Sequence, residues 1–308
     1  MLVCRQYTVF QPFIITLIVL KNKIRVYATC FWQSDDLLYN DLTLYGFGKA
    51  EWKNIEFVTD NSFDIAVILT SPHENHRSFV PEKAVTFFTE PPASPHHKKT
   101  TKNACPMYLP LPWCFHSQHK EEVLSTSHNI KKSKFLSAVT SELCWLEGHQ
   151  KRLSFLFHLD AIFAQGLDIF GRKQTGQIFS QFKNYRSELT DKYDGLIPYR
   201  YHFAGENSFI PDYFTEKILD PILAECLCFY DGCTNIAAYL DHRAFIKIDV
   251  TNIQNSIDTI IRSIKNKEYF KRREFIVKEK RRILTELNPL NIIWATLNGK
   301  DLSKQFKL

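Results

Sequence analysis

The sequence predicts an α/β protein built from two doubly wound domains that share a cleft. The chain has 308 residues, about twice the length of a typical domain. Hydrophobic residues make up 44% of it, without repeats or low-complexity tracts, so each half can bury a core of its own. In both halves, short apolar runs, those of the first half rich in β-branched residues, alternate with polar stretches of helical length, which is typical of parallel sheets with crossover helices.

The first half contains three predicted strands, at residues 23–32 (KIRVYATCFW), 63–69 (FDIAVIL) and 84–88 (AVTFF). Residues 93–134 are then mostly polar, apart from MYLPLPWCF, which favours a domain boundary near residue 130. We therefore expect an apolar extension over residues 1–22, one Rossmann-like domain over 23–130, and a second with C-terminal helices over 131–308.

The second half repeats the alternation. Strands are expected at 134–140, 167–171, 199–208, 226–230 and 244–250, and helices at 149–159 and 215–226. In doubly wound folds, ligands bind outside the carboxyl ends of the strands, where helix N-termini offer free N–H groups and a partial positive charge. The segments that follow the predicted strands are therefore the candidates for a binding site.

The N-terminal run TVFQPFIITLIVL (8–20) is apolar but shorter than a membrane span, and it contains Gln11 and Pro12. It fits an extra strand, a short helix, or the hydrophobic region of a signal or anchor sequence. We expect a cytoplasmic or peripheral membrane location, with membrane anchoring through this segment as the alternative.

The basic residues are concentrated in one segment. Residues 262–282 hold ten Lys or Arg against three Glu, in a chain whose net charge is +6. The apolar residues of this segment recur at helical spacing, which indicates one long amphipathic helix whose basic face is solvated. The alternative is that this basic face contacts an anionic membrane surface or partner. A nucleic-acid partner is not expected, because the basicity is confined to this segment.

The cysteine and histidine residues do not indicate a metal site. The eight cysteines are scattered, and their only cluster, Cys226, Cys228 and Cys233, fits a buried strand better than zinc-ligand spacing. The pairs His73/His76 and His96/His97 have no nearby set of further ligands. We therefore assign no metal and expect reduced thiols.

The segment GENSFIPDYFTEK (205–217) gathers polar groups at the end of a predicted strand. Lys217 near the start of a helix conflicts with the helix dipole, and a bound phosphate would remove that conflict. Glu216 beside it is suited to accept hydrogen bonds from ribose hydroxyls. The alternative is an ordinary capped helix, with Thr215 as N-cap and Glu216 as a first-turn acid.

The run FAGENSFIPDYFTEKILDPILAECLCFYDG (203–232) resembles the C-terminal signature of the family 10 glycosyltransferases, the α1,3/α1,4-fucosyltransferases. Glu206, Asn207 and Ser208 match its first block, and 213–217 match its second, with the family's spacing. LDIFGR (167–172) and AFIKIDV (244–250) resemble neighbouring strands. The resemblance is strong over roughly residues 134–250.

This resemblance implies a GT-B fold with two Rossmann-like domains. The domain over 23–130 would bind a glycan acceptor and the domain over 131–308 would bind GDP-fucose. The implied reaction is an inverting transfer of fucose to an acceptor hydroxyl, with no obligatory cofactor or metal. The implied donor-binding residues are Arg152, Asn207, Ser208, Tyr213, Glu216 and Lys217.

Roles follow for several residues. Glu216 would bind the ribose, Lys217 the diphosphate, and Arg152 the β-phosphate, where it would stabilise charge growing on the departing GDP. Inversion needs a general base on the acceptor side. Glu90, just after the predicted strand 84–88, partly matches a bacterial family motif and is the first candidate; Glu74 in SPHENH is the second.

The sequence also departs from the family pattern. Gly205 stands where the family usually has phenylalanine, Pro91 and Pro92 follow Glu90, and CLCFYDG replaces a valine- and proline-rich strand. These departures leave two alternatives open: transfer of another nucleotide-linked sugar, or a nucleotide- or glycan-binding protein that has lost its base.

Overall fold

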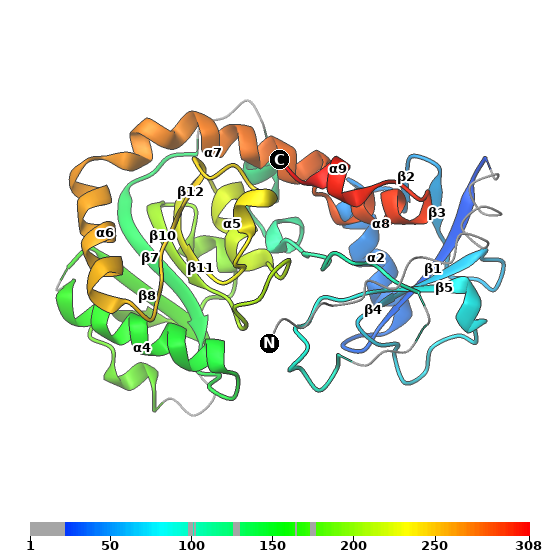
Figure 1. Ribbon diagram of the computed structural model, residues 1–308, viewed down its shortest axis with the longest axis horizontal. Helices are drawn as coiled ribbons and strands as arrows, with labels where there is room; N and C mark the ends of the chain where they lie inside the picture. The colour runs from blue at the N-terminus through cyan, green and yellow to red at the C-terminus, as the bar shows by residue number, and fades with distance from the viewer. Residues whose placement is uncertain (1–21, 98–100, 102, 126–129, 164, 173–176) are drawn as a thin grey trace, which may run out of the picture. The chain divides into compact units, whose positions relative to one another are not determined.

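The computed structural model describes residues 22–97, 101, 103–125, 130–163, 165–172 and 177–308. These residues form two compact units (Figure 1). Of the described residues, the first unit contains those up to Leu109 together with Asn288–Phe306, and the second contains those from Pro110 to Leu287 with the last two residues. Each unit has its own sheet, which confirms the predicted α/β class with two Rossmann-like domains.

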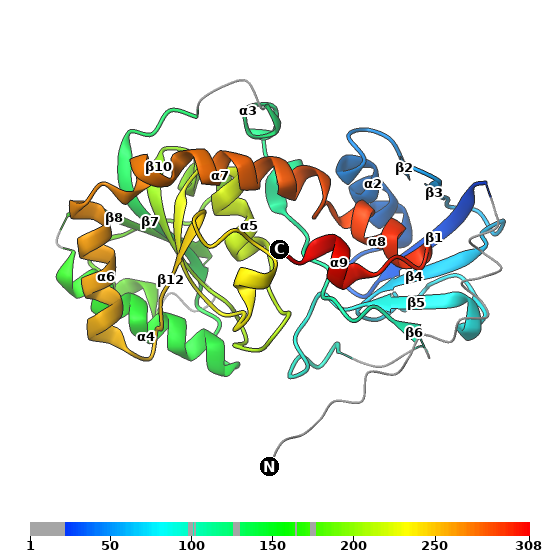
Figure 2. The same ribbon diagram turned by 45° about the horizontal axis from the view of Figure 1, so that its top comes forward.

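The first unit is built on a sheet in the order β2-β3-β1-β4-β5-β6. All neighbouring strands run parallel except the pair β2 and β3, and Figure 2 shows β1, β4, β5 and β6 following one another across the sheet. The strands β1 and β4, which are rich in β-branched residues, are buried, as a parallel sheet covered on both faces requires. The elements are β1 (Ile24–Cys30), α2 (Asp35–Tyr45), β2 (Glu51–Trp52), β3 (Ile55–Phe57), β4 (Ile65–Leu69), η1 (Pro81–Lys83), β5 (Ala84–Phe87) and β6 (Asn103–Ala104).

Two C-terminal helices belong to this first unit, although the sequence placed them in the domain over 131–308. They are α8 (Pro289–Leu297) and α9 (Leu302–Phe306). The indole Nε1 of Trp52 donates to Asn291 Oδ1 at 3.0 Å, and Asn288 Nδ2 donates to the carbonyl of Tyr45 at 3.0 Å. The chain therefore returns to its first sheet after completing the second.

The second unit has a fully parallel sheet in the order β12-β11-β10-β7-β8-β9. In both figures, α4 and α7 lie on opposite sides of this sheet. Its elements are η2 (Trp113–His116), α3 (Lys120–Leu124), β7 (Lys134–Ser141), α4 (Glu147–Ile162), β8 (Leu167–Arg172), η3 (Phe179–Gln181), β9 (Tyr185–Ser187), η4 (Lys192–Gly195), β10 (Tyr199–Gly205), α5 (Glu216–Leu223), β11 (Leu227–Asp231), η5 (Ile236–Ala238), β12 (Phe245–Lys247), α6 (Ile253–Lys265) and α7 (Glu268–Thr285).

The strand order places the centre of this sheet at β7 and β10. The chain moves from β7 through α4 to β8 on one side, and from β10 through α5 to β11 on the other. The order of connection therefore reverses between β7 and β10. Outside their carboxyl ends lies the crevice in which doubly wound folds bind their ligands.

The boundary between the units lies at Leu109/Pro110 rather than near residue 130. The polar stretch after it packs on the second unit through hydrogen bonds. Trp113 N–H donates to Asp220 Oδ1 at 2.8 Å, and Ser117 Oγ donates to Asp191 Oδ2 at 2.7 Å. Composition shows that this stretch is a connection, but it does not show which sheet the stretch packs against.

The basic segment 262–282 forms parts of two helices instead of one long helix. Lys267 separates α6 from α7 and has a φ of 54°, in the left-handed region. Several of its cations are held by carboxylates: Glu268 pairs with Lys271 and Arg272, and buried Glu225 pairs with Lys280 and Arg273 at 3.1 Å each. The basic face is therefore less available to solvent than its composition indicates.

Residues 1–21 lie outside the described part of the chain, and with them nearly all of the expected extension over 1–22. Within the described residues, none of the helices combines the length and the apolar character that crossing a membrane requires.

Replacing Lys280 with Met should destabilise the second unit by about 3 kcal/mol, because it removes one of two cations from a carboxylate that is almost completely buried. Urea unfolding followed by circular dichroism measures this change. Lys278→Met, on an exposed position of the same helix, is the matched control and should leave the unfolding midpoint unchanged. Equal midpoints for the two variants would contradict the stabilising role of the Glu225–Lys280 pair.

Candidate functional site

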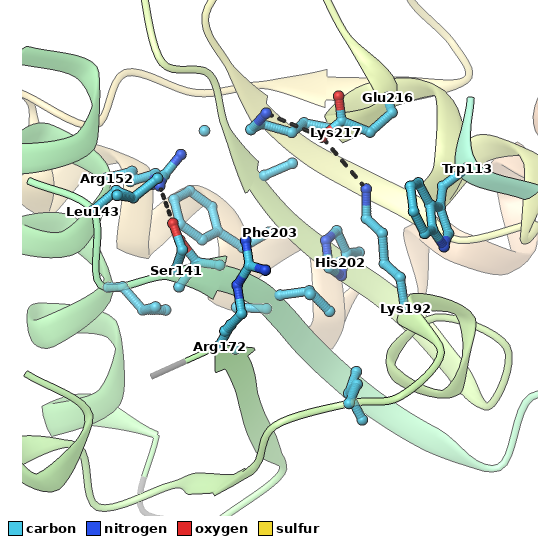
Figure 3. Close-up of a pocket in the computed structure, with 18 of the residues that line it drawn as sticks. Trp113, Ser141, Leu143, Arg152, Arg172, Lys192, His202, Phe203, Glu216 and Lys217 are labelled. Atoms are coloured by element: carbon cyan, nitrogen blue, oxygen red, sulfur yellow. Dashed lines mark hydrogen bonds and ion pairs between the residues drawn. The ribbon is translucent and has the colours of Figure 1, made fainter. Parts of the chain in front are cut away.

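A pocket of about 480 Å³ lies at the crevice between β7 and β10, entirely within the second unit (Figure 3). It is lined by the carboxyl ends of β7, β8 and β10, by the start of α5, and by the segment before η4. The polar and aromatic lining residues are Trp113, Thr140, Ser141, Arg152, Arg172, Glu188, Thr190, Lys192, His202, Phe203, Asn207, Glu216 and Lys217. The pocket therefore occupies the position that the strand order predicts.

Arg152 enters the pocket from α4 and is only 5% exposed. Its Nη1 donates to Asn207 Oδ1 at 2.6 Å and its Nη2 donates to Ser141 Oγ at 3.1 Å. Burial lowers the pKa of Arg152 to about 10, against the opposing effect of Glu206 and Glu216, so the guanidinium is charged at neutral pH. Its Nε and the Oγ of Thr140 are buried without a hydrogen-bond partner among the described residues, and both residues line the pocket.

Two glycines let the backbone approach this arginine and its partner closely. A Cβ on Gly205 would lie 2.9 Å from the Cβ of Arg152, and a Cβ on Gly148 would lie 2.4 Å from the carbonyl oxygen of Asn207. Side chains at these positions would push α4 away from the end of β10. The departure from the family pattern at Gly205 thus has a local reason, since a larger side chain would displace Arg152.

The start of α5 brings Glu216 and Lys217 to the pocket. Thr215 caps the helix, as its Oγ accepts the N–H of Lys217 at 3.3 Å. Lys217 Nζ lies 3.1 Å from Glu216 Oε1. Burial alone would raise the pKa of Glu216, but Lys217 and Lys192 lower it to about 2, so this carboxylate is ionised at every physiological pH.

Lys192 provides a further cation that sequence reasoning missed. Its Nζ lies 2.7 Å from Asp220 Oδ2 and 3.7 Å from Glu216 Oε1, and it extends toward them beside the ring of Trp113 (Figure 3). Burial lowers its pKa, but Asp220 and Glu216 raise it more. Asp220 has no exposed surface and also accepts the backbone N–H of Trp113 and the hydroxyl of Tyr193. One buried carboxylate thus fixes both the cation and the aromatic residue.

Arg172 is a second missed cation, at the end of β8. It is exposed, and Figure 3 shows its guanidinium extending into the pocket. The only signal for it was the strand LDIFGR, which ends in this arginine. No periodicity or spacing pointed to Lys192, because it begins the short 3₁₀ helix η4 in the connection between β9 and β10.

The structure brings together four of the six predicted donor-binding residues: Arg152, Asn207, Glu216 and Lys217 all line the pocket. Ser208 and Tyr213 are not among the lining residues. Ser208 lies in the loop after β10, and Tyr213 is 1% exposed, packed within the unit.

The two candidate bases lie in the first unit and are therefore not part of this pocket. Glu90 follows Thr89 in the loop after β5, and its backbone carbonyl accepts a hydrogen bond from His97 Nδ1 at 2.8 Å. Glu74 lies in the loop after β4.

A family comparison matches residues 129–288 to "Glycosyltransferase family 10 (fucosyltransferase) C-term". Among solved structures, "alpha1,3-Fucosyltransferase with GDP" has a TM-score of 0.52 at 16% identity, over 96% of this chain and 98% of that one. A structure titled "alpha1,3-Fucosyltransferase" has a TM-score of 0.51 at 15% identity and the same coverage. A glycosyltransferase from Rickettsia africae has a TM-score of 0.50 at 10% identity, over 90% of this chain and 99% of that one.

Because His202 is buried in the pocket, we expect the free energy of unfolding to depend on pH. Burial, together with Lys192 and Lys132, lowers its pKa from 6.5 to about 3. Between these values the unfolded chain binds a proton that the folded chain does not, so stability falls as the pH falls from about 6.5 toward 3. The expected contribution is about 1 kcal/mol per pH unit.

Urea unfolding between pH 7 and pH 4.5 measures this dependence. His202→Gln, which keeps a polar side chain near Ser137 Oγ but cannot titrate, should show a shallower loss than the wild type. The same slope in both proteins would show that His202 does not cause the effect.

Proposed function

The chain belongs to glycosyltransferase family 10, the fucosyltransferases, and on this premise we propose that it transfers fucose from GDP-fucose to a hydroxyl of a glycan acceptor, with inversion at the anomeric carbon. The observation that carries the proposal is the cationic pocket at the centre of the second sheet. Arg152, Lys192 and Lys217 all line it, together with Glu216. A nucleoside diphosphate has the negative charge that this set is suited to bind.

The roles follow from the chemistry of each side chain. Lys217 and Arg152 bind the diphosphate, and Arg152 stabilises the charge that develops on GDP as it leaves. Glu216, ionised and beside Lys217, accepts hydrogen bonds from the ribose hydroxyls. A solved α1,3-fucosyltransferase of similar fold was crystallised with GDP, which agrees with a guanosine nucleotide as the carrier.

The transfer itself requires an acceptor hydroxyl and a base. The acceptor oxygen forms a bond to the anomeric carbon while the bond from that carbon to the β-phosphate oxygen breaks, and the electron pair of that bond leaves with GDP. The hydroxyl proton passes to a carboxylate on the acceptor side. We assign this role to Glu90, with Glu74 as the second candidate.

A second candidate function is transfer of a different nucleotide-linked sugar. It is favoured by Gly205, which lies against Arg152 and so alters the packing of the donor pocket relative to the family pattern. A screen of GDP- and UDP-linked sugars distinguishes the two functions. Binding of GDP without turnover of any donor would favour a binding protein instead.

Arg152→Ala and Lys217→Ala should each weaken GDP binding about tenfold to a hundredfold, because each removes a charged hydrogen-bond donor to the diphosphate. Isothermal titration calorimetry with GDP measures this loss. Lys151→Ala is the matched control, since Lys151 neighbours Arg152 on α4 but pairs with Glu147 and does not line the pocket. Unchanged affinity in both pocket variants would contradict this donor site.

Glu90→Gln should lower kcat for acceptor-dependent GDP release about a hundredfold or more, while GDP affinity stays unchanged, because general-base assistance is lost. Glu74→Gln in the same assay decides between the two candidates and should retain activity. A Glu90→Gln enzyme with full activity would transfer the role to Glu74 or to another group.

A further inference from the structure

At the amino end of the second sheet, an arginine lies beside two exposed phenylalanines. The guanidinium carbon of Arg200, near the start of β10, is 5.3 Å from the centre of the Phe135 ring and 5.8 Å from that of Phe270. Phe135 is the second residue of β7, and Phe270 belongs to the first turn of α7. They are 52% and 60% exposed, although phenylalanine is usually buried. The two rings therefore form one exposed patch around a cation, instead of occurring singly on the surface.

The turn between α6 and α7 holds Phe270 in this patch. Lys267, with its left-handed φ of 54°, accepts the N–H of Phe270 on its backbone carbonyl at 3.0 Å. The neighbouring Tyr269 is only 3% exposed, and its N–H donates to the hydroxyl of Tyr201 at 3.3 Å. Tyr201 follows Arg200 on β10, so the turn is fixed to the strand that carries the arginine.

The lysines next to the two phenylalanines extend further into solvent than the acids with which they pair. The side chain of Lys134 is 52% exposed against 16% for Asp168, and that of Lys271 is 61% exposed against 22% for Glu268. Each of these acids also has an arginine partner. The outward charge on both sides of the patch is therefore positive.

Two further exposed lysines, Lys131 and Lys267, lie at the same end of the sheet. Arg200 Nη2 donates to the carbonyl of Lys132 at 3.3 Å, which brings the segment of Lys131 beside the arginine. Lys267 begins the turn that leads to Phe270. The next exposed acid along α7, Glu274, lies one turn beyond Phe270. The patch is thus apolar at its centre and has several cations around it.

This patch and the candidate donor pocket lie at opposite ends of the same strands. Phe135 is the second residue of β7, whereas Ser141, its last residue, lines the pocket. Six residues of a strand span about 20 Å. A partner with an extended surface can therefore cover the patch and leave the pocket open to a soluble nucleotide.

We propose that this patch binds the surface of a membrane that contains anionic lipids. Phe135 and Phe270 enter the interfacial region, and Arg200 with the surrounding lysines contacts the lipid phosphates. An anionic bilayer combines the two features that the patch requires, since acyl chains lie directly beneath a layer of negatively charged headgroups. This site differs from the rest of the basic segment 262–282, where Lys280 and Arg273 are held by the buried Glu225.

Sedimentation of the full chain with lipid vesicles tests the inference. The wild type should bind vesicles of phosphatidylcholine and phosphatidylserine at least about tenfold more tightly than vesicles of phosphatidylcholine alone, and added salt should weaken this binding. The double variant Phe135→Ser with Phe270→Ser should lower binding to the mixed vesicles about tenfold or more, because both apolar anchors are lost. Phe47→Ser is the matched control, since Phe47 is 52% exposed but belongs to the first unit.

A charge reversal gives a second, independent measurement. Lys267→Glu should lower binding to the mixed vesicles several-fold and leave binding to neutral vesicles unchanged. Lys278→Glu makes the same change at an exposed position of α7 and should have a much smaller effect. Lys278 lies about 12 Å along the helix from Phe270, which exceeds the Debye length of about 8 Å at physiological ionic strength.

Urea unfolding midpoints equal to that of the wild type show that the variants are folded, and GDP affinity, measured on the same proteins, tests the proposed function separately. A wild type that does not bind the mixed vesicles overturns the inference. Equal vesicle binding by the wild type and the phenylalanine double variant also overturns it, and would move membrane binding to another part of the chain. Equal effects of Lys267→Glu and Lys278→Glu would likewise contradict a contact centred on this patch.

Discussion

The carboxylate of Glu206 holds together the two ends of the segment on which the donor pocket depends. It has no exposed surface, and it accepts the N–H of Thr215 at 2.9 Å and the Oγ–H of Thr215 at 2.8 Å. The hydroxyl of Tyr230 donates to the same group at 3.3 Å. Burial raises the pKa of Glu206, and Lys217 nearby counteracts this rise. Glu206 thus fixes where α5 begins, and with it the positions of Glu216 and Lys217.

The rest of the pocket is organised in a similar way: carboxylate and amide oxygens position cations that would otherwise repel one another. Asp220 holds Lys192, Glu216 lies between Lys192 and Lys217, and Asn207 orients Arg152. A diphosphate entering the pocket replaces contacts that are already formed instead of gathering mobile side chains, so less conformational entropy is lost on binding. The first unit uses ring stacking instead, and there the loop after Glu90 is fixed by His96 and His97.

Much of the second sheet could be predicted from the sequence, because its main strands are short, largely apolar and aromatic runs between polar stretches, and a parallel sheet buries both faces. Asn207, Glu216 and Lys217 could be predicted because strand end, cap and helix start are consecutive in one segment. Lys192 and Arg172 could not, because one begins η4 and the other ends β8, and only the fold brings these separate elements to the pocket. Tyr213 shows the reverse case: it matches the motif but is packed inside the unit.

Other features left no local signal at all. The break between α6 and α7 occurs at Lys267, in a left-handed conformation that usually requires glycine or asparagine, so the sequence reads as one helix. The return of α8 to the first unit depends on contacts such as Trp52 with Asn291, which are 239 positions apart in the chain. Long-range pairs of this kind cannot be derived from composition or periodicity.

A crystal structure of the protein with GDP tests the central claim most directly. The account predicts the diphosphate at the carboxyl ends of β7 and β10, within hydrogen-bond distance of Arg152 and Lys217, and the ribose hydroxyls on Glu216. A diphosphate bound elsewhere in the second unit, or a ribose directed away from Glu216, would contradict the assignment of this pocket as the donor site.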